Sequence, residues 1–412
     1  MPRTDTLAID FGTSNTAASV LRDGTPHFIS LEAQGDTMPT AVFLDFHRRQ
    51  TLVGEAAIAA LVSGREGRFM RALKSVLGTS LLHEKRQFLN ERLTLSEVII
   101  RFLSQVKARA EADCGQAFPR VLSGRPVHFH SRDPERDARA LADLTTCYHA
   151  AGFTEVDFLF EPAAAALAAA EAGGGLGLIV DIGGGTSDFS LFRRTEGATE
   201  VIASHGIRLG GTDFDRHLSL TYVMPLLGKG TGLKAEIGPK VHDAPVALFH
   251  DLASWEKIPF LYTAPTRRDV ARMAKLAVEP VRFNRLVSVL ENELGHDIAF
   301  AVERGKILAN GEDGQGVIDL GLVEAGLAPG LSRHDLSKAL FEDADRIGAA
   351  AAETLEMANV PPEAVERIVL VGGSSLLTSV SQAVQAQMPQ SRLTYSAAFT
   401  AVAHGLAIAA AQ

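Results

Sequence analysis

Two periods of apolar residues divide the chain into expected strands and helices. Thr6–Asp10 and Thr16–Arg22 alternate apolar and polar positions on either side of a polar turn, which predicts a hairpin. The same pattern returns about 170 residues later, where Gly177–Asp181 and Phe189–Arg193 flank a second polar turn. An internal repeat of this kind predicts two similar lobes that face each other across a cleft.

Apolar residues three or four positions apart predict helices in most of the remaining chain. Arg120–Phe129 and Ile368–Val371 are expected to be further strands, and Leu218–Thr266 has no clear period and suggests an irregular insertion. The expected helices cover Gly54–Leu61, Phe69–Leu77, Leu95–Glu111, Pro134–Ala151, Glu161–Ala172, Arg268–Leu308, Leu376–Met388 and Ala397–Ala411.

These elements predict an α/β chain of two lobes. The length of 412 residues, 46% of them apolar, suits two α/β lobes better than one compact domain. We place the first lobe at residues 1–175 together with 395–412. The second lobe is expected at 176–394, with the insertion at about 220–310, and Gly173-Gly174-Gly175 is expected to end a helix and link the lobes.

Charge and composition exclude several classes of partner. The formal net charge of −9 argues against nucleic acid, which usually demands a basic face. Met1–Asp5 lacks the apolar core of a signal peptide, and no stretch is long enough to span a bilayer. Cys114 and Cys147 form no CxxC pair and are expected to be idle thiols. We therefore predict a soluble cytoplasmic protein with no nucleic-acid or membrane partner.

Three glycine-rich turns that follow apolar strands suit the binding of phosphate. The turns are Gly12–Asn15, Gly183–Thr186 and Gly372–Ser374. Glycine lets the backbone approach phosphate oxygens closely with its N–H groups as donors, and the hydroxyl groups of Thr13, Ser14 and Thr186 add further donors. One such turn is weak support, whereas two copies in matched strand contexts and a third after another apolar strand are specific.

An aspartate precedes each of the first two turns and indicates a metal ion. Asp10 and Asp181 would repel phosphate directly, so a hydrated cation is expected between each carboxylate and the phosphates. Magnesium keeps several of its waters and takes few carboxylates. We therefore predict Mg²⁺, held by Asp10 and Asp181 through water.

Longer motifs are similar to the DnaK-type heat-shock ATPase, a member of the actin-like ATPase superfamily. The likeness extends from Ala8 to about Ala409, is weakest between about 220 and 300, and is closest to the short YegD-type members. It implies duplicated ribonuclease-H-like lobes with a nucleotide cleft between them. Its motifs are the first two glycine turns, Phe160–Leu167, Leu209–Asp215 and Val369–Ser375, with Gly124–Val127 and Met224–Gly228 for the YegD-type members.

The resemblance implies ATP or ADP with Mg²⁺ as ligands and assigns roles to matching residues. Lys74 would meet the γ-phosphate and Glu161 would orient water or the metal shell, with Thr186 and Asp181 as further catalytic residues. Pro126 matches a proline that relays nucleotide state. Nucleotide contacts are implied for Gly12, Thr13, Ser14, Asn15, Gly183, Gly184, Gly185, Thr186, Gly210, Gly211, Glu303, Lys306, Gly372, Gly373 and Ser374.

Two positions depart from the family pattern. Ile307 and Leu376 stand where the family places arginines against the adenine, which weakens cation–π contact with the base by about 1 kcal/mol each. Other features allow plainer interpretations. Lys74 can be a solvated charge on a helix, Glu161 can cap the alanine-rich helix, and His128 and His130 are better explained as alternating strand positions than as metal ligands.

The predicted function is an ATP-binding and ATP-hydrolysing chaperone-like protein whose lobes open and close with nucleotide state. Nothing follows Ala397–Ala411, so we expect no peptide-binding domain and instead a protein partner or co-chaperone. Three alternatives stay open: a sugar or small-acid kinase, a pseudo-ATPase switch, and an actin-like filament protein. The kinase would need an alcohol-deprotonating Asp outside the phosphate loops, and we find none in convincing context.

Overall fold

The computed structural model describes residues 5–22, 24–33, 35–88, 91–168, 175–195, 198–396 and 400–410. Its internal contacts divide the chain into two compact units. The first comprises 1–211 with 344–412, the second comprises 212–343, and each is described by itself. Among the described residues no helix is both long enough and apolar enough to cross a bilayer. The expected linker glycines Gly173 and Gly174 lie outside the described residues.

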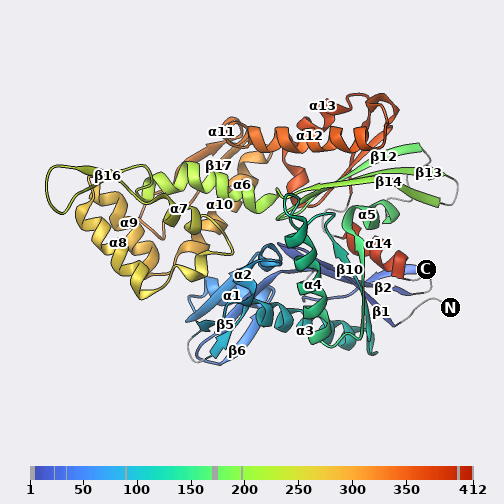
Figure 1. Ribbon diagram of the computed structural model, residues 1–412, viewed down its shortest axis with the longest axis horizontal. Helices are drawn as coiled ribbons and strands as arrows, with labels where there is room; N and C mark the ends of the chain where they lie inside the picture. Colours follow the sequence, from blue (N-terminus) through green and yellow to red (C-terminus); the bar gives the residue numbers. More distant parts are fainter. Residues whose placement is uncertain are drawn as a thin grey trace. The chain divides into compact units, whose positions relative to one another are not determined.

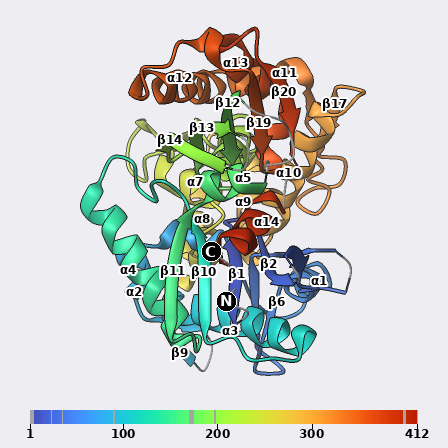
Figure 2. The same ribbon diagram turned by 90° about the vertical axis from the view of Figure 1, so that its right-hand side faces the viewer.

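The first unit contains a sheet built around the first strand of the chain (Figure 2). β1 pairs in parallel with β10 and antiparallel with β2, so the sheet has a parallel half and an antiparallel half. The predicted strand at 120–129 ends earlier, at Arg125, because Pro126 has no N–H to donate to a ladder. In sheet order the strands are β11 (Glu155–Phe160), β10 (Arg120–Arg125), β1 (Thr6–Phe11), β2 (Asn15–Arg22) and β3 (Thr25–Phe28), with β4 (Thr37–Pro39) also on β2.

A second sheet in the same unit repeats this topology. β12 pairs in parallel with β19 and antiparallel with β13, as β1 does with β10 and β2. Asp181 is the penultimate residue of β12, as Asp10 is of β1. The structure thus confirms the α/β class and the internal duplication. In sheet order the strands are β14 (Ala198–Ile207), β13 (Ser187–Thr195), β12 (Gly175–Ile182), β19 (Arg367–Val371) and β20 (Arg392–Tyr395).

Two short alanine-rich helices connect the two sheets. α5 (Glu161–Ala168) and α14 (Ala401–Ala410) pack against each other (Figures 1 and 2). Their small side chains share one buried cluster with Ile179 of β12 and Val369 of β19. The predicted lobe boundaries at 175/176 and 394/395 stay predictions, and the strands of the two sheets divide near them. Other helices of the unit are α3 (Leu95–Cys114), α4 (Pro134–Ala150) and α13 (Thr378–Gln387).

A small three-stranded sheet corrects one helix prediction. Residues 69–77 were expected to be helical, but Phe69 and Met70 lie in β7 (Gly67–Arg71), which pairs with β5 (Ala41–Asp45). Ala72 then takes a left-handed conformation with φ 59°, and Leu73–Val76 forms a 3₁₀ turn. Pairing with a distant strand has overridden the local helical period. Nearby elements are β6 (Gln50–Val53), α1 (Glu55–Val62), α2 (Ser80–His83), β8 (Arg86–Phe88) and β9 (Glu91–Leu93).

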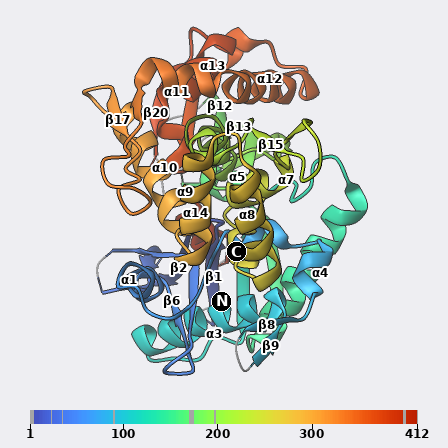
Figure 3. The same ribbon diagram turned by 90° about the vertical axis from the view of Figure 1, so that its left-hand side faces the viewer.

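The second unit is mostly helical and corrects a further prediction. The expected helix over 268–308 is three helices, and the proline at the start of the second separates it from the first. α8 and α9 lie side by side (Figures 1 and 3). Trp255 is 2% exposed and packs in the core of this unit. The helices are α6 (Gly211–Leu218), α7 (Val246–Leu252), α8 (Ala264–Leu276), α9 (Pro280–Glu291), α10 (Gly295–Asn310) and α11 (Arg333–Ala339), and α12 (Phe341–Met357) follows them.

The strands of the second unit form two short hairpins. The sequence Gly228-Lys229-Gly230-Thr231-Gly232 is similar to that of a phosphate loop. Gly228 and Lys229 lie in a turn that leads into a strand rather than a helix, so this loop lacks the element that follows a phosphate loop. The strands are β15 (Gly232–Lys234), β16 (Val241–Asp243), β17 (Gln315–Val317) and β18 (Gly330–Ser332).

Candidate functional site

The two glycine turns predicted to bind phosphate lie against each other in the first unit. A methyl group on Gly184 would lie 2.5 Å from Ser14 Oγ and 3.0 Å from Thr13 Cβ. One on Gly185 would lie 3.1 Å from Thr13 Oγ1. Turns that are separated by about 170 residues are therefore in direct contact at the ends of β1 and β12, as the internal repeat predicts.

Backbone hydrogen bonds fix the shape of the second turn. Gly183 N donates to Thr186 O at 3.0 Å, which closes the turn. Gly211 N donates to Gly183 O at 3.0 Å, and a methyl on Gly210 would lie 2.7 Å from Gly185 N. Gly210 and Gly211 therefore pack against the second turn, and only glycine fits at position 210.

The third glycine turn contacts Gly211, which packs against the second turn, through a serine. Gly372 has φ 83°, a conformation that favours glycine, and a methyl there would lie 2.3 Å from Ile182 O. Ser374 Oγ lies 2.4 Å from the methyl position of Gly211. The structure thus brings together Gly12–Asn15, Gly183–Thr186, Gly210–Gly211 and the turn at 372–374 within one unit.

Lys74 and Glu161 form a buried ion pair beside the first two turns. Lys74 Nζ lies 2.5 Å from Glu161 Oε1, and the residues are only 7% and 8% exposed. Lys74 lies in the 3₁₀ turn after β7, and Glu161 is the first residue of α5. The plainer interpretation of Lys74 as a solvated charge is wrong, because its side chain is buried. A charge-assisted hydrogen bond between buried groups fixes both side chains.

Four carboxylates share this region with one ammonium group. Burial, and then the charge of Glu161, raises the pKa of Asp10 to about 7 and that of Asp188 to about 8. The same two causes raise the pKa of Asp181 well above its ordinary value. Burial alone would lower the pKa of Lys74, but the carboxylates of Glu161 and Asp10 outweigh it and raise the pKa. If all four carboxylates were ionised, the cluster would carry more negative charge than Lys74 neutralises.

A hydrated divalent cation fits this donor set. Buried carboxylates that repel one another are stabilised by a cation, and hard oxygen ligands suit Mg²⁺. No group of three or more His, Cys, Asp or Glu residues in the described part of the chain is arranged to hold a metal directly. That Asp10 and Asp181 hold the ion through its own waters stays a prediction from the sequence.

The stability of the metal-free protein is expected to fall as pH rises through neutrality. Asp10 and Asp188 bind protons more tightly in the folded state, with pKa values of about 7 and 8, than in the unfolded chain, where aspartate titrates near pH 4. The folded state therefore holds more protons between pH 4 and 8, and the free energy of unfolding decreases over that range.

Urea denaturation at pH 5, 6, 7 and 8 in EDTA measures this slope, which we expect to be on the order of 1 kcal/mol per pH unit. Mg²⁺ should stabilise the protein more at pH 8 than at pH 5, and Asp10→Asn should flatten the slope. Equal Mg²⁺ effects at both pH values would contradict a cation site at these carboxylates.

The segment that follows Lys74 is held by α4 and the loop before it. His130 Nε2 donates to Leu77 O at 2.7 Å, and Gly78 N donates to Asp143 Oδ2 at 2.9 Å. Gly78 has φ 73°, and a methyl there would lie 2.4 Å from Arg136 O of α4. The position of the Lys74 turn therefore depends on contacts between residues that are 53 and 65 positions apart in sequence.

Two histidines noted in the sequence have different places from those expected. His128 and His130 lie beyond the end of β10, so they are not alternating strand positions. Burial lowers the pKa of His130 below its ordinary value. His130 is 6% exposed, and its backbone N–H donates to Asp137 Oδ1 at 3.0 Å. Its role in the structure is to anchor the Lys74 turn.

Two predicted nucleotide contacts belong to the second unit. Lys306 is buried, and its Nζ lies 2.7 Å from Asp215 Oδ1. Asp215 Oδ2 also accepts a hydrogen bond from Trp255 Nε1 at 3.3 Å. Lys306 therefore takes part in a buried network, and its contact with a nucleotide, like that of Glu303, stays a prediction.

The two positions that depart from the family pattern are exposed apolar residues. Ile307 on α10 is 62% exposed and Leu376 after β19 is 48% exposed. Aliphatic side chains offer dispersion contact to a purine but no positive charge above its face. Weaker binding of the base than of the phosphates stays the expectation.

Asp188 is a site residue that the sequence prediction missed. Its carboxylate accepts a hydrogen bond from Val127 N at 2.6 Å, and its side chain is buried beside Thr186. Asp188 pairs with Asp181 across the second hairpin, where the first hairpin has Ala17 opposite Asp10. Comparison of the two repeats by register would have identified this extra carboxylate. It connects the second turn to the segment after Pro126.

Comparisons with known proteins agree with this arrangement. The sequence model of the family described as Hsp70 protein matches residues 6–240. The chain is 31% identical over 222 residues to the chaperone protein DnaK of Metamycoplasma hominis, covering 52% of this chain and 34% of that protein. It is 28% identical over 392 residues to the chaperone protein DnaK of Mycoplasmoides gallisepticum, covering 93% of this chain and 56% of that protein.

A third relative, the chaperone protein DnaK of Ureaplasma urealyticum serovar 10, is 30% identical over 219 residues, which cover 51% of this chain and 33% of that protein. The chain thus spans between a third and just over half of the length of these relatives. The family match and the duplicated sheets establish the two-lobed actin-like ATPase fold. Because the family model covers more than half of its 412 residues, this protein belongs to the Hsp70 family.

Proposed function

We propose that this chain binds ATP with Mg²⁺ and hydrolyses it. The observation that carries the proposal is the direct contact between the first two glycine turns beside the buried Lys74–Glu161 pair. Backbone N–H groups and hydroxyl groups of both turns offer donors to phosphate oxygens, and Lys74 offers the positive charge. Membership of the Hsp70 family supports the same activity.

Each residue of the cluster has a distinct task in this proposal. Thr13 and Ser14 of the first turn and Thr186 of the second hold the terminal phosphates. Lys74 stabilises the charge that develops on the transferred phosphoryl group. Glu161 holds Lys74 and orients the attacking water, whose approach is the step that a hydrolase must organise. Mg²⁺, held through water by Asp10 and Asp181, would neutralise phosphate charge when bound.

ATP hydrolysis with Mg²⁺, measured together with nucleotide binding, tests the proposal. Wild type should turn over ATP, and Thr186→Ala should lose turnover while binding persists. The exposed Thr146 on α4, whose hydroxyl group donates to Ala142 O, gives a matched control as Thr146→Ala. Tight binding without turnover in wild type would contradict the enzyme and leave a nucleotide-binding pseudo-ATPase.

The same assay distinguishes the other two alternatives. A sugar or small-acid kinase would show turnover that one metabolite stimulates strongly, with phosphate on that metabolite rather than in solution. A filament protein would scatter more light when ATP is added. Free phosphate without a stimulating metabolite and without scattering excludes both.

We also infer that nucleotide state controls a contact with a protein partner, as in a chaperone or its regulator. The support is the family match and the chaperone names of the relatives. The similarity to short YegD-type members, carried by Gly124–Val127 and Met224–Gly228, stays a prediction from sequence. Affinity capture with ATP-locked and ADP-bound protein tests the inference, and a set of partners that does not change with nucleotide would contradict it.

His130 is expected to set the position of Lys74 in this reaction. His130→Leu removes the donor to Leu77 O and should lower kcat about tenfold while nucleotide affinity changes little, because the Lys74 turn is displaced. His130→Gln places an amide N–H near the same point and should recover most of kcat. Steady-state kinetics and a binding titration of both variants make the comparison. Equal losses in kcat for the two would show that the hydrogen bond has no positioning role.

A further inference from the structure

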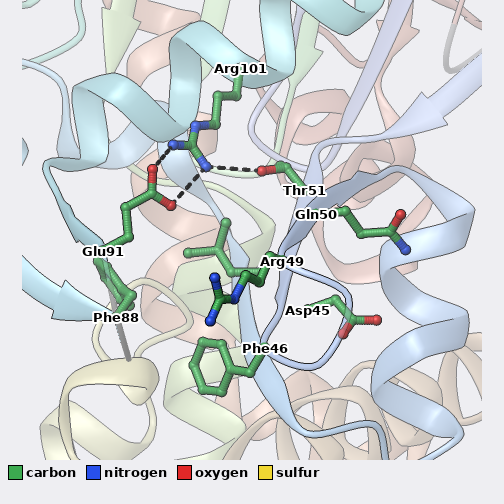
Figure 4. A pocket seen from close by; sticks show the side chains of 9 residues that line it. Asp45, Phe46, Arg49, Gln50, Thr51, Phe88, Glu91 and Arg101 are labelled. Atoms are coloured by element: carbon green, nitrogen blue, oxygen red, sulfur yellow. Dashed lines mark hydrogen bonds and ion pairs between the residues drawn. The ribbon is translucent and has the colours of Figure 1, made fainter.

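A second site candidate lies on the small sheet of the first unit, away from the phosphate turns in sequence (Figure 4). It is a half-open pocket with a volume of about 270 Å³. The turn between β5 and β6, Phe88 of β8, Glu91 of β9 and helix α3 line it. This volume is just below the range of about 300–1,000 Å³ for small-molecule sites, so a ligand smaller than a nucleotide is the appropriate size.

One wall of the pocket is held rigid by an arginine. Arg101 of α3 donates to both carboxylate oxygens of Glu91, and its Nη1 also donates to Thr51 Oγ1 at 3.1 Å (Figure 4). A bidentate pair with a third bond fixes the guanidinium plane. The charges of Arg101 and Glu91 compensate each other, so this wall is pre-organised but nearly neutral.

The second carboxylate of the pocket is also compensated. Asp45 Oδ1 accepts a hydrogen bond from Arg48 N at 2.9 Å, and Asp45 Oδ2 lies 3.6 Å from Arg65 Nη1. Both interactions favour the ionised form, and the hydrogen bond from Arg48 is the first cause of a lowered pKa for Asp45. Asp45 is 4% exposed, so it supports the turn rather than attracting a cation.

Arg49 leaves a positive charge uncompensated at the pocket. The structure gives it no ion pair or side-chain hydrogen bond with any described residue, and it lines the pocket beside Phe46 (Figure 4). Its φ is 51°, a left-handed conformation that is uncommon for a residue with a side chain. Glycine would fit this turn position more easily, so the arginine side chain is present at a conformational cost.

Two aromatic rings supply an apolar surface in the same pocket. Phe88 at the end of β8 is 7% exposed, and Phe46 in the β5–β6 turn is half-buried. Both rings line the pocket together with Leu44. An apolar group between them would lose water contact, and a flat ring would gain stacking or edge contact.

We propose that this pocket binds a carboxylate that is attached to a phenyl-sized apolar group, with the carboxylate at Arg49 and the apolar group against Phe46 and Phe88. An arginine fork matches a carboxylate in geometry and charge. An ammonium ligand has no free partner here, because Glu91 and Asp45 are already paired. A free aromatic acid and a peptide that ends in phenylalanine both carry this chemistry.

Titration of the full chain with 3-phenylpropionate, followed by NMR of ¹³C-methyl or backbone amide groups, tests the proposal. We expect saturable shifts around residues 44–51 and 88–101 with a millimolar dissociation constant, as suits a ligand of this size. Arg49→Gly suits the left-handed backbone at this turn position, yet it should weaken binding at least about tenfold. Arg49→Lys should recover part of the affinity.

Two controls give the test its specificity. 2-Phenylethylamine, which carries the opposite charge, should not produce the shifts. Arg139→Ala removes an exposed arginine of α4 and should leave binding unchanged. Equal binding by the amine, unchanged binding in Arg49→Gly, or no saturable binding would each overturn the proposal.

A peptide ending in Phe-COO⁻ and its C-terminal amide distinguish the two sources of ligand. Tighter binding of the peptide acid than of 3-phenylpropionate, and loss of binding in the amide, would assign the pocket to a protein C-terminus. Binding of 3-phenylpropionate alone would assign it to a free aromatic acid. Either result supports the carboxylate site at Arg49.

Discussion

Lys74→Met is expected to slow ATP hydrolysis by a factor of about 10²–10³, while nucleotide affinity changes only a few-fold. Lys74 is the ammonium group whose pKa responds to Asp10, Asp188 and Glu161, so it is the cation in contact with the carboxylate cluster. Charge that builds on the transferred phosphoryl group would then lack the ammonium group that is paired with Glu161. Single-turnover hydrolysis and a separate binding titration measure the two quantities.

Stability must be separated from chemistry in this experiment. Lys74→Met leaves Glu161 buried without its partner, and breaking a buried pair in this way costs about 3–5 kcal/mol. The double variant Lys74→Met/Glu161→Gln removes the orphaned charge and should regain much of the melting temperature without regaining turnover. Lys229→Ala, in the loop that resembles a phosphate loop only in sequence, is the matched control. Full turnover in Lys74→Met would remove Lys74 from the mechanism.

The phosphate turns were predictable because their chemistry is local. The strand, the aspartate, the glycines and the hydroxyl groups follow one another within about ten residues in both copies. The duplication predicts that the two turns lie opposite each other. The close contact between Gly184 and Thr13 agrees with this prediction. Local order and internal symmetry are the features that a single sequence displays directly.

The support of Lys74 was not predictable, because it depends on distant contacts. Residues 69–77 have a helical period, yet the first of them pair with β5 as a strand. Ala72 then takes a left-handed backbone conformation. His130 and Asp143 then hold Leu77 and Gly78 from other elements. Nothing in the spacing of these residues indicates that they meet, since tertiary pairing and not local propensity decides the outcome.

Lys306 shows a different limit of prediction by motif. The resemblance assigns it to the nucleotide, and the structure places its ammonium group on Asp215 inside the second unit. A motif identifies the residue type at a position. The interaction partner of that residue depends on which neighbours, such as Trp255, are buried beside it. Buried charges need a partner in the absence of ligand as well as in its presence.

Gly405 lies where α14 packs against α5, and the space at this position admits no side chain. A methyl group there would lie 1.7 Å from Ala164 O and 2.4 Å from Ala164 C, both backbone atoms that no rotamer change can move. α5 begins with Glu161. The side chains of Glu161, Val402 and Leu406 all lie close to Gly124, so α14 packs near this glutamate. The spacing of the two helices therefore sets where the carboxylate of Glu161 meets Lys74.

Gly405→Ala is expected to destabilise the protein by about 3 kcal/mol, because the helices must separate to admit the methyl group. Separation also moves Glu161, so turnover should fall by more than the loss of folded protein explains. Gly330→Ala adds the same methyl group at a glycine with no atom within 4 Å of the new carbon, and it should change neither property. Chemical denaturation and turnover per folded molecule provide the comparison. If Gly405→Ala lost stability but kept full turnover per folded molecule, the α5–α14 contact would support the fold without positioning Glu161, and the geometry of the ion pair would have to depend on the Lys74 turn alone.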